Sequence, residues 1–339
     1  MKQIPANFTA ATRYFSDIDV CVDFVAEMRW PNGVVCPHCA CERVSYLRSR
    51  RIWKCMAKDC HKQFSVKTGS VFEDSPIPLR DWLAAVWLVV NCKNGISSYE
   101  IARHVGVTQK SGWFMLHRIR RALRHGSWTK IGGSGSEVEV DEAFVGGKLK
   151  NMHKGRRARV KQLGETYAAI GVPNRYSNKI AVMGMFDRES RQVRANVIPN
   201  VRRETLQNEI LNHIEHGSKV YTDQAPAYGS LLKDKYIHET VNHVEEYVRG
   251  QVHTNAMENF WSLMKRTLHG TYVAVEPFHL SRYVDEQVFR FNNRATKDNP
   301  LDDADRFMLA MSQIAGKRLT YAELTGKVEE TTGGQSTNF

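Results

Sequence analysis

Long hydrophobic runs are missing from this sequence of 339 residues. The longest conspicuous apolar segment covers residues 82–90, which is far too short to span a bilayer, and the N-terminus carries no apolar signal-peptide region. Internal repeats and a phosphate-binding glycine loop are also missing. These absences argue against a membrane-spanning chain, a solenoid and a P-loop nucleotide enzyme. We expect a protein of the cytoplasm.

Acidic residues are fewer than basic residues in this sequence. The chain has 36 Asp and Glu residues against 48 Lys and Arg residues, which gives a formal charge of +12 and a pI near 9.4. Lys and Arg gathered on one surface gain affinity for a polyanion because binding releases its counterions. The composition therefore favours a nucleic-acid partner, but many kinds of protein are basic and the motifs must decide.

Cysteine is also scarce, and its seven copies are not spaced as a disulfide framework. Four of them follow the pattern Cys36-x2-Cys39-x15-Cys55-x4-Cys60, in which two pairs on separate turns can close a tetrahedral zinc site. The spacing is close to that of a zinc ribbon. Because four protein ligands leave no open position, we expect structural Zn²⁺.

Two alternatives accompany this zinc site. The cysteines can be reduced core residues, or Cys41, His38 or His61 can replace Cys60 as the fourth ligand. Five basic residues lie between the cysteine pairs, where they contact phosphate or form a solvated face: Arg43, Arg48, Arg50, Arg51 and Lys54.

A helical module follows the ribbon. Residues 82–91 predict a compact apolar helix, and residues 98–124 predict a helix, a turn and a second helix, with Ser98 as the first cap and Gly106 in the turn. The packed face of the second helix consists of Gly112, Met115, Leu116, Ile119 and Leu123. A separate stripe, suited to the DNA major groove, consists of Lys110, Phe114, His117 and Arg121. An ordinary three-helix packing unit with a charged face is the alternative.

Three acidic residues stand where regular structure can hold a metal-binding carboxylate. Asp141 lies in a strand at 137–141, whose period-two alternation separates its valines from its acids. Asp223 ends a second short strand at 219–223. Glu258 lies on a helix at 255–268, whose apolar residues recur at helical spacing and would pack on a sheet: Met257, Phe260, Trp261, Met264 and Leu268.

Such a trio has a chemical use. Phosphodiester cleavage can employ two divalent ions, about 3.5–4 Å apart, one activating the attacking oxygen and the other stabilising the leaving oxygen. Mg²⁺ prefers oxygen ligands and often binds through only one or two carboxylates. Three convergent acids can therefore hold a pair of Mg²⁺ (or Mn²⁺) ions. The alternative is that these acids are solvated surface charges.

A family resemblance covers most of the chain. Its blocks are Glu139-Val140-Asp141-Glu142 with Gly146-Gly147-Lys148, then residues 221–223, 253–258 and 279–294. Together they resemble the ISXO2-like, IS1595-family insertion-sequence transposases, which are similar to the DDE transposase and integrase group with its ribonuclease-H-like catalytic fold. The resemblance implies that Asp141, Asp223 and Glu258 form the metal-binding triad of an enzyme.

Further basic and polar residues accompany the triad. The spacing Glu258-x6-Lys265 resembles part of a signature of some other DDE transposases, and Asn255, one turn before Glu258, is a possible helper. Seven basic residues and no acid occur between 148 and 161: Lys148, Lys150, Lys154, Arg156, Arg157, Arg159 and Lys161. We expect this run, Lys154, Arg156 and Arg157 included, to bind substrate phosphate; a solvated insertion is the alternative.

The sequence thus predicts a multidomain α+β and α/β chain. We expect an N-terminal helix and zinc ribbon at 1–75, a helix-turn-helix-like DNA-binding module at 76–130, a ribonuclease-H-like DDE catalytic domain with a mixed sheet at 136–300, and a C-terminal helix with a polar tail at 301–339. The flexible glycine-rich stretch at 131–136 separates the second and third parts.

The expected function is DNA transposition. A metal-dependent enzyme would cleave at insertion-element ends and transfer the 3′ hydroxyl into target DNA. Its partners would be double-stranded DNA, as terminal repeats and as target, and further copies of the chain in a synaptic complex, at the nucleoid of a bacterial cytoplasm. The alternatives are a noncatalytic DNA-binding regulator derived from a transposase and a metal-dependent DNA nuclease without strand transfer.

Overall fold

The structure is a computed structural model of the chain. It describes residues 4–124, 129–147, 153–155, 157–158, 162, 179–223, 228, 235–241, 254–297 and 299–327. The chain divides into two compact units. We call Gly126–Asn292 the sheet unit, and Met1–His125 together with Asn293–Phe339 the helical unit.

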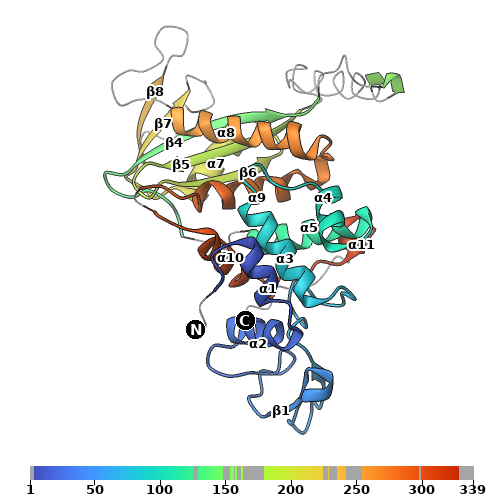
Figure 1. Ribbon diagram of the computed structural model, residues 1–339. Coiled ribbons are helices and arrows are strands. Elements are labelled where there is room, and N and C mark those ends of the chain that lie inside the picture. Colours follow the sequence, from blue (N-terminus) through green and yellow to red (C-terminus); the bar gives the residue numbers. More distant parts are fainter. Residues whose placement is uncertain are drawn as a thin grey trace. The chain divides into compact units, whose positions relative to one another are not determined.

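In its described residues, the sheet unit is built on a sheet of five strands (Figure 1). These are β4 (Glu137–Val145), β5 (Ile180–Asp187), β6 (Gln192–Ile198), β7 (Lys219–Asp223) and β8 (Ile237–Val241), in the spatial order β6-β5-β4-β7-β8. The strands β4, β7 and β8 run parallel, whereas β5 pairs antiparallel with both β4 and β6. The predicted mixed sheet is therefore confirmed, and β5 and β6 form an antiparallel hairpin within it.

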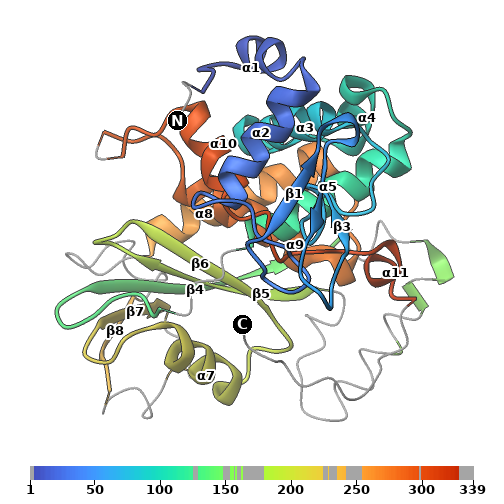
Figure 2. The ribbon, with the colours of Figure 1, turned by 90° about the horizontal axis from the view of Figure 1, so that it is seen from below.

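Helices cover both faces of this sheet (Figure 2). Helix α7 (Arg203–His213) lies on one face, where its Leu206 and Ile210 pack with Val138 and Val140 of β4. Helices α8 (Asn255–Thr267) and α9 (Leu280–Asn292) lie on the other face, joined through a π-helical turn at Leu268–Tyr272 and a 3-10 turn at Pro277–His279. β4 is consequently an interior strand with both of its faces covered.

The predicted apolar stripe of α8 is confirmed, since all five of its residues are buried against the sheet. Gly184 of β5 makes this close packing possible. A Cβ atom at Gly184 would lie 2.2 Å from Met257 Cε and 2.7 Å from Trp261 Cζ2. Gly184 is also the β5 partner of Asp141. The helix thus lies directly over the strand position beside Asp141.

The helical unit contains the ribbon and most of the remaining helices. Its elements are α1 (Phe8–Tyr14), α2 (Ile18–Arg29), β1 (Val44–Leu47), β2 (Ile52–Cys55), β3 (Gln63–Phe64), α3 (Leu79–Asn91), α4 (Ser98–Val105), α5 (Gln109–Leu123), α10 (Asp303–Met311) and α11 (Tyr321–Leu324). The strands β1, β2 and β3 form an antiparallel sheet. Stacked rings of Trp53 and Phe64, 6.0 Å apart, form its small core with Trp30.

The caps of α4 and α5 fix the turn between them. Gly106 ends α4 in the left-handed conformation with φ of 76°, and the Thr108 side chain accepts a hydrogen bond from Ser111 N at the start of α5. The prediction of Ser98 as the cap of α4 is wrong. Ser97 is the N-cap, because it alone stands three residues before Glu100 and so completes a capping box.

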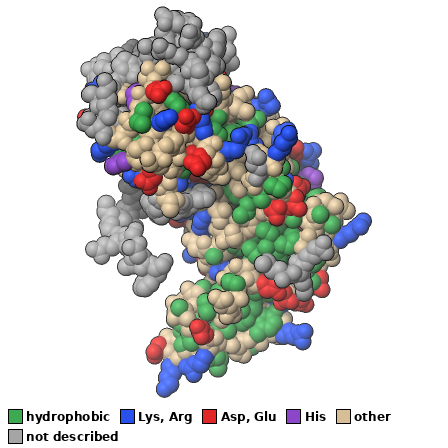
Figure 3. Space-filling model, turned by 90° about the vertical axis from the view of Figure 1, so that its left-hand side faces the viewer, with side chains coloured by type: hydrophobic (Ala, Val, Ile, Leu, Met, Phe, Trp, Pro, Cys, Tyr) green, Lys and Arg blue, Asp and Glu red, His purple; other side chains and the backbone are tan. Residues whose placement is uncertain are grey.

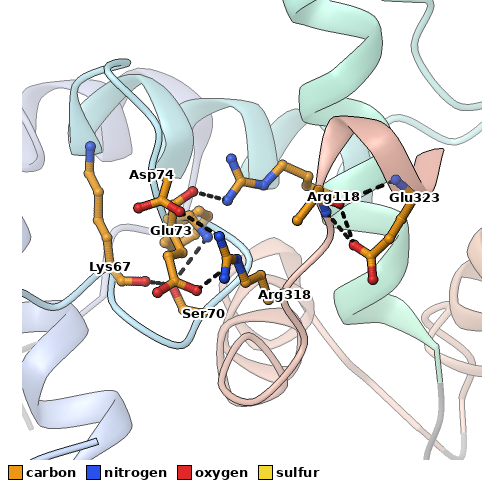
Figure 4. Close-up of polar contacts among 9 residues, drawn as sticks. Lys67, Ser70, Glu73, Asp74, Arg118, Arg318 and Glu323 are labelled. Atoms are coloured by element: carbon orange, nitrogen blue, oxygen red, sulfur yellow. Dashed lines mark hydrogen bonds and ion pairs between the residues drawn. The ribbon is translucent and has the colours of Figure 1, made fainter. Parts of the chain in front are cut away.

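The C-terminal segment packs within the helical unit. On α10, Phe307 contacts the ring of Trp87 with centroids 5.0 Å apart, and Arg306 Nε donates to Asn91 Oδ1 over 2.8 Å. Beyond α10, Arg318 forms ion pairs with Glu73 at 3.2 Å and Asp74 at 2.7 Å (Figure 4). These contacts join residues 306–318 to α3 and to the segment that follows the ribbon.

Within the parts of the chain that the structure describes, no helix is both long enough and apolar enough to cross a membrane.

Replacing Gly184 by Ala should weaken the sheet unit by about 1–3 kcal/mol, because the rigid Trp261 ring cannot move aside as the Met257 terminus can. Native-state hydrogen exchange of β4 and β5 amides reports this loss for the sheet unit alone. The control is Gly270→Ala, since a Cβ at Gly270 would meet no heavy atom within 4 Å. Equal protection in the two variants would contradict the steric account.

Candidate functional site

Asp141 occupies the centre of β4 on the face that α8 covers. Its Oδ1 accepts a hydrogen bond from Glu142 N over 2.8 Å, and its Oδ2 accepts one from Trp261 Nε1 over 3.0 Å. The side chain is half-buried. Because one donor belongs to the strand backbone and the other to α8, the docked helix orients the carboxylate.

Asp223 ends β7, the parallel neighbour of β4. The last register pair between these strands joins Val140 with Thr222, so the Asp141 and Asp223 backbones each follow this pair by one residue. Only the backbone of Asp223 belongs to the described structure. The convergence of all three acids therefore stays a prediction.

Glu258 lies in the first turn of α8. It is exposed, together with Asn255, Ser262 and Lys265, and these four residues form a polar stripe along the helix. Met257 and Trp261, in contrast, are buried against the sheet. The carboxylate of Glu258 and the ammonium group of Lys265 are therefore carried on the solvent side of a helix whose other side is fixed.

Glu139 is the residue whose importance the sequence pattern did not reveal. Its side chain is only 1% exposed. Its Oε2 accepts hydrogen bonds from Ala256 N at 2.9 Å and Met257 N at 3.2 Å, and its Oε1 accepts one from Arg188 Nε at 2.8 Å. An acid on an interior strand requires such partners when buried. The position of Glu139 on an interior strand was therefore the one sign in the sequence that it needs buried partners. The sequence could not identify these partners, because they come from distant segments.

Arg188 connects this carboxylate with a second acid of β4 and with β7. Its Nη1 donates to Glu137 Oε2 over 2.8 Å, and its guanidinium lies 4.6 Å from the ring centroid of Tyr221 on β7. Burial, with a contribution from Glu137, raises the pKa of Tyr221 to about 12. Tyr221 therefore stays a neutral hydrogen-bond donor, and the Arg188 guanidinium lies between the carboxylates of Glu137 and Glu139.

The predicted DNA-facing stripe of α5 is only partly exposed. Lys110 is exposed in the first turn, while Phe114 and Arg121 are half-buried. The Lys110 ammonium lies 4.9 Å from the ring centroid of Tyr321, and the Phe114 and Tyr321 centroids are 5.6 Å apart. The first turn of α5 is thus the accessible part of the stripe.

The inclusion of His117 in that stripe is wrong for this structure. The residue is 0% exposed, and its ring packs edge-on against Trp113 with centroids 4.7 Å apart. The packed face predicted for α5 is confirmed, because Gly112, Met115, Leu116, Ile119 and Leu123 are all buried. The burial of α5 extends further round the helix than its apolar pattern indicated, since Arg118 and Arg120 are buried as well.

The basic run falls mainly outside the described residues, which exclude Lys148, Lys150, Arg156, Arg159 and Lys161. Two members are described. Lys154 is exposed, and Arg157 is half-buried with its N–H donating to His153 O.

Four cysteines of the ribbon converge. The Sγ atoms of Cys36, Cys39, Cys55 and Cys60 all lie within 4.8 Å of one another. The distance is 3.8 Å between Cys36 and Cys60 and 3.5 Å between Cys39 and Cys55. Four thiolates at about 2.3 Å around a tetrahedral Zn²⁺ are about 3.8 Å apart, so the donor set fits zinc.

The residues weighed as substitute ligands are not part of this group. The thiol of Cys41 instead approaches Arg43 O at 3.9 Å, and neither His38 nor His61 belongs to the metal-type cluster found among the described residues. Exposed Lys and Arg side chains also lie on the ribbon surface (Figure 3). Among them are Arg48 and Arg50, in the turn between β1 and β2.

Comparisons with known proteins agree with this division of the chain. A family model described as the ISXO2-like transposase domain matches residues 132–292, and a model described as the transposase zinc-ribbon domain matches residues 17–63. The first match falls within the sheet unit and the second includes all four clustered cysteines.

Individual relatives are also described by transposable elements or transposases. A protein described as an uncharacterized protein in transposable element ISH50 of Halobacterium salinarum is 31% identical over 73% of this chain and 81% of its own length. A transposase-like protein of Haemophilus influenzae is 32% identical over 30% of this chain and 81% of its own length.

A solved simian T-cell lymphotropic virus intasome, in complex with PP2A regulatory subunit B56 gamma, matches 63% of this chain and 70% of its own chain at 13% identity. Its TM-score of 0.29 is too low to support an inference. The family is instead given by the extended match to the ISH50 protein and the two domain matches. On that basis, the chain belongs to the ISXO2-like, IS1595 family of insertion-sequence transposases.

Proposed function

We propose that this chain is a DDE-type transposase, which hydrolyses a phosphodiester at an element end and joins the exposed 3′ hydroxyl to target DNA. The observation that carries the proposal is the hydrogen bond from Trp261 to Asp141, because it fixes the helix bearing Glu258 against the strand bearing Asp141. A ribonuclease-H-like domain is the fold we propose. Its support is the parallel group β4-β7-β8, which is extended on the β4 side by the antiparallel hairpin of β5 and β6.

The described acids suit Mg²⁺ or Mn²⁺. Asp141 and Glu258 offer the hard oxygen donors that these cations prefer, and Asp223 would complete the set. When bound, two such ions would activate the attacking oxygen and stabilise the leaving oxygen. Asp141 and Asp223 would hold the ions, Glu258 would complete the site, and Asn255 would assist it. Lys265, on the same exposed stripe, would position a substrate phosphate.

We assign DNA contacts to three surfaces. The exposed first turn of α5, with Lys110 and the half-buried Arg121 further along, would read element ends in the major groove, as in a helix-turn-helix. Lys154, Arg156 and Arg157 would bind the backbone near the catalytic acids. The ribbon arginines Arg48 and Arg50 would add phosphate contacts.

The domain limits proposed from the sequence, 1–75, 76–130, 136–300 and 301–339, would separate zinc binding, end recognition, catalysis and the C-terminal helix. A synaptic complex would bring two ends together, and so we propose a homo-oligomer on DNA. In the ribbon, Zn²⁺ held by the four clustered cysteines would be structural, since no ligand position stays open.

Asp141→Asn, Asp223→Asn and Glu258→Gln should each retain DNA binding and lose hydrolysis and joining by on the order of 100-fold or more. Neutral amides keep the side-chain size but weaken a metal site worth several kcal/mol of transition-state stabilisation. Mapped cleavage and joined products on element ends with Mg²⁺ provide the measurement. Glu204→Gln is the control, because Glu204 is an exposed acid on α7.

The same assay separates the alternative functions. Joining at the wild-type rate in any folded triad variant would remove that residue from the triad. Specific binding without cleavage by the wild type would identify a DNA-binding regulator, and cleavage without joined products would identify a nuclease.

Neutralising Lys110 and Arg121 together should weaken binding to element ends more than to random duplex, because a helix in the major groove makes base contacts. Neutralising Lys154, Arg156 and Arg157 should weaken both and reduce the salt slope by about one for each phosphate that the variant no longer neutralises. Binding isotherms across several salt concentrations compare the variants. Equal reductions in affinity for both DNAs in the Lys110 and Arg121 variant would reject its role in specificity.

Cys39→Ser or Cys60→Ser should lose zinc and unfold the ribbon, because structural zinc affinity contributes directly to folding. Metal analysis of the purified chain measures the loss. Cys41→Ser is a matched control that should keep its zinc, since Cys41 lies outside the four-cysteine cluster. If Cys41→Ser lost its zinc while Cys39→Ser and Cys60→Ser kept theirs, Cys41 would be a ligand and the proposed ligand set would be wrong.

A further inference from the structure

We propose that Glu139 is a positioning residue, which holds the first turn of α8, and with it Glu258, in register with Asp141. The inference rests on the proposed function and adds to the triad a fourth acid that does not bind the metal. Glu139 and Asp141 are two residues apart on one face of β4, so the strand pattern alone makes both of them eligible as ligands.

Both acids accept hydrogen bonds on both of their carboxylate oxygens, and what distinguishes them is burial and a cationic donor. Both oxygens of Glu139 face protein donors, namely the Arg188 guanidinium and the amides of Ala256 and Met257. The residue is buried, whereas Asp141 is half-buried beside an exposed polar stripe. Glu139 therefore uses its charge inside the protein, and the metal-ligand role belongs to Asp141.

The N-cap side chain of α8 does not cap the helix. Helices leave their first amide groups without intrahelical acceptors, and a side chain at the N-cap usually supplies one. Thr254, the N-cap of α8, makes no side-chain cap bond, and the first intrahelical bond runs from Glu258 N to Thr254 O. Glu139 accepts from the two amides just before Glu258. A carboxylate from a distant strand thus replaces the local cap.

This replacement couples the cap to the site. Glu139 holds α8 at Ala256 and Met257, and Asp141 holds it one turn later at Trp261. Glu258 lies between these two points of attachment. Loss of the first attachment would let the opening turn fray and move Glu258, while the buried apolar side of α8 stayed packed.

Glu139→Gln tests the positioning role, with Glu137→Gln as the matched control. Both residues pair with Arg188 from the same strand, but the α8 amide bonds belong to Glu139. We expect Glu139→Gln to speed hydrogen exchange at the start of α8. We also expect the half-saturating Mg²⁺ concentration for cleavage to rise about tenfold or more, as for groups that orient metal ligands. Glu137→Gln should change either quantity less than about twofold, since it leaves those amide bonds in place.

Native-like hydrogen-exchange protection of the β4 and β5 amides in Glu139→Gln would show that the sheet unit of the variant is folded. Should it fail to fold, Glu139→Asp keeps the charge but shortens the reach to α8, and the same two shifts are expected. Unchanged exchange at α8, or an Mg²⁺ dependence equal to that of Glu137→Gln, would overturn the positioning role. If the wild-type protein cleaved no DNA with Mg²⁺, the proposed function would instead be overturned. The hydrogen-exchange data alone would then test whether Glu139 caps the start of α8.

Discussion

The arrangement of the sheet unit depends most on the hydrogen bonds that the buried carboxylate of Glu139 accepts from Arg188 and from the first turn of α8. A helix cap typically stabilises a protein by about 0.5–2 kcal/mol, whereas leaving one partner of a buried ion pair alone costs about 3–5 kcal/mol. The second value is larger, so the main constraint is burial of the charge. β4 can bury Glu139 only when Arg188 and the α8 amides reach it together.

Side-chain packing between α8 and the sheet then sets the distance between α8 and β4. Gly184 leaves room for the Met257 and Trp261 side chains, and the indole N–H of Trp261 then reaches Asp141. A larger residue at Gly184 would move the helix outward and lengthen that hydrogen bond. The proposed chemistry therefore depends on an apolar contact at the position opposite Asp141 as much as on the acids themselves.

Local patterns predicted the elements well because each left a repeating trace in the sequence. The alternation around Asp141, the helical spacing after Asn255 and the cysteine pairs all correspond to observed structure. Tertiary partners left no such trace. The burial of His117 and the ties from Glu139 to α8 and to Arg188 depend on segments distant in sequence. Predicting them would have required knowing which segments meet.

The most direct test of the central claim locates the metal ions themselves. Crystals of the chain with element-end DNA and Mn²⁺, measured at the manganese absorption edge, would show the ions as anomalous peaks. We predict peaks within coordination distance of Asp141, Asp223 and Glu258, with Glu139 still bonded to the Ala256 and Met257 amides. A peak coordinated by Glu139, or ions bound away from Asp141, would contradict the division of roles between the two acids of β4.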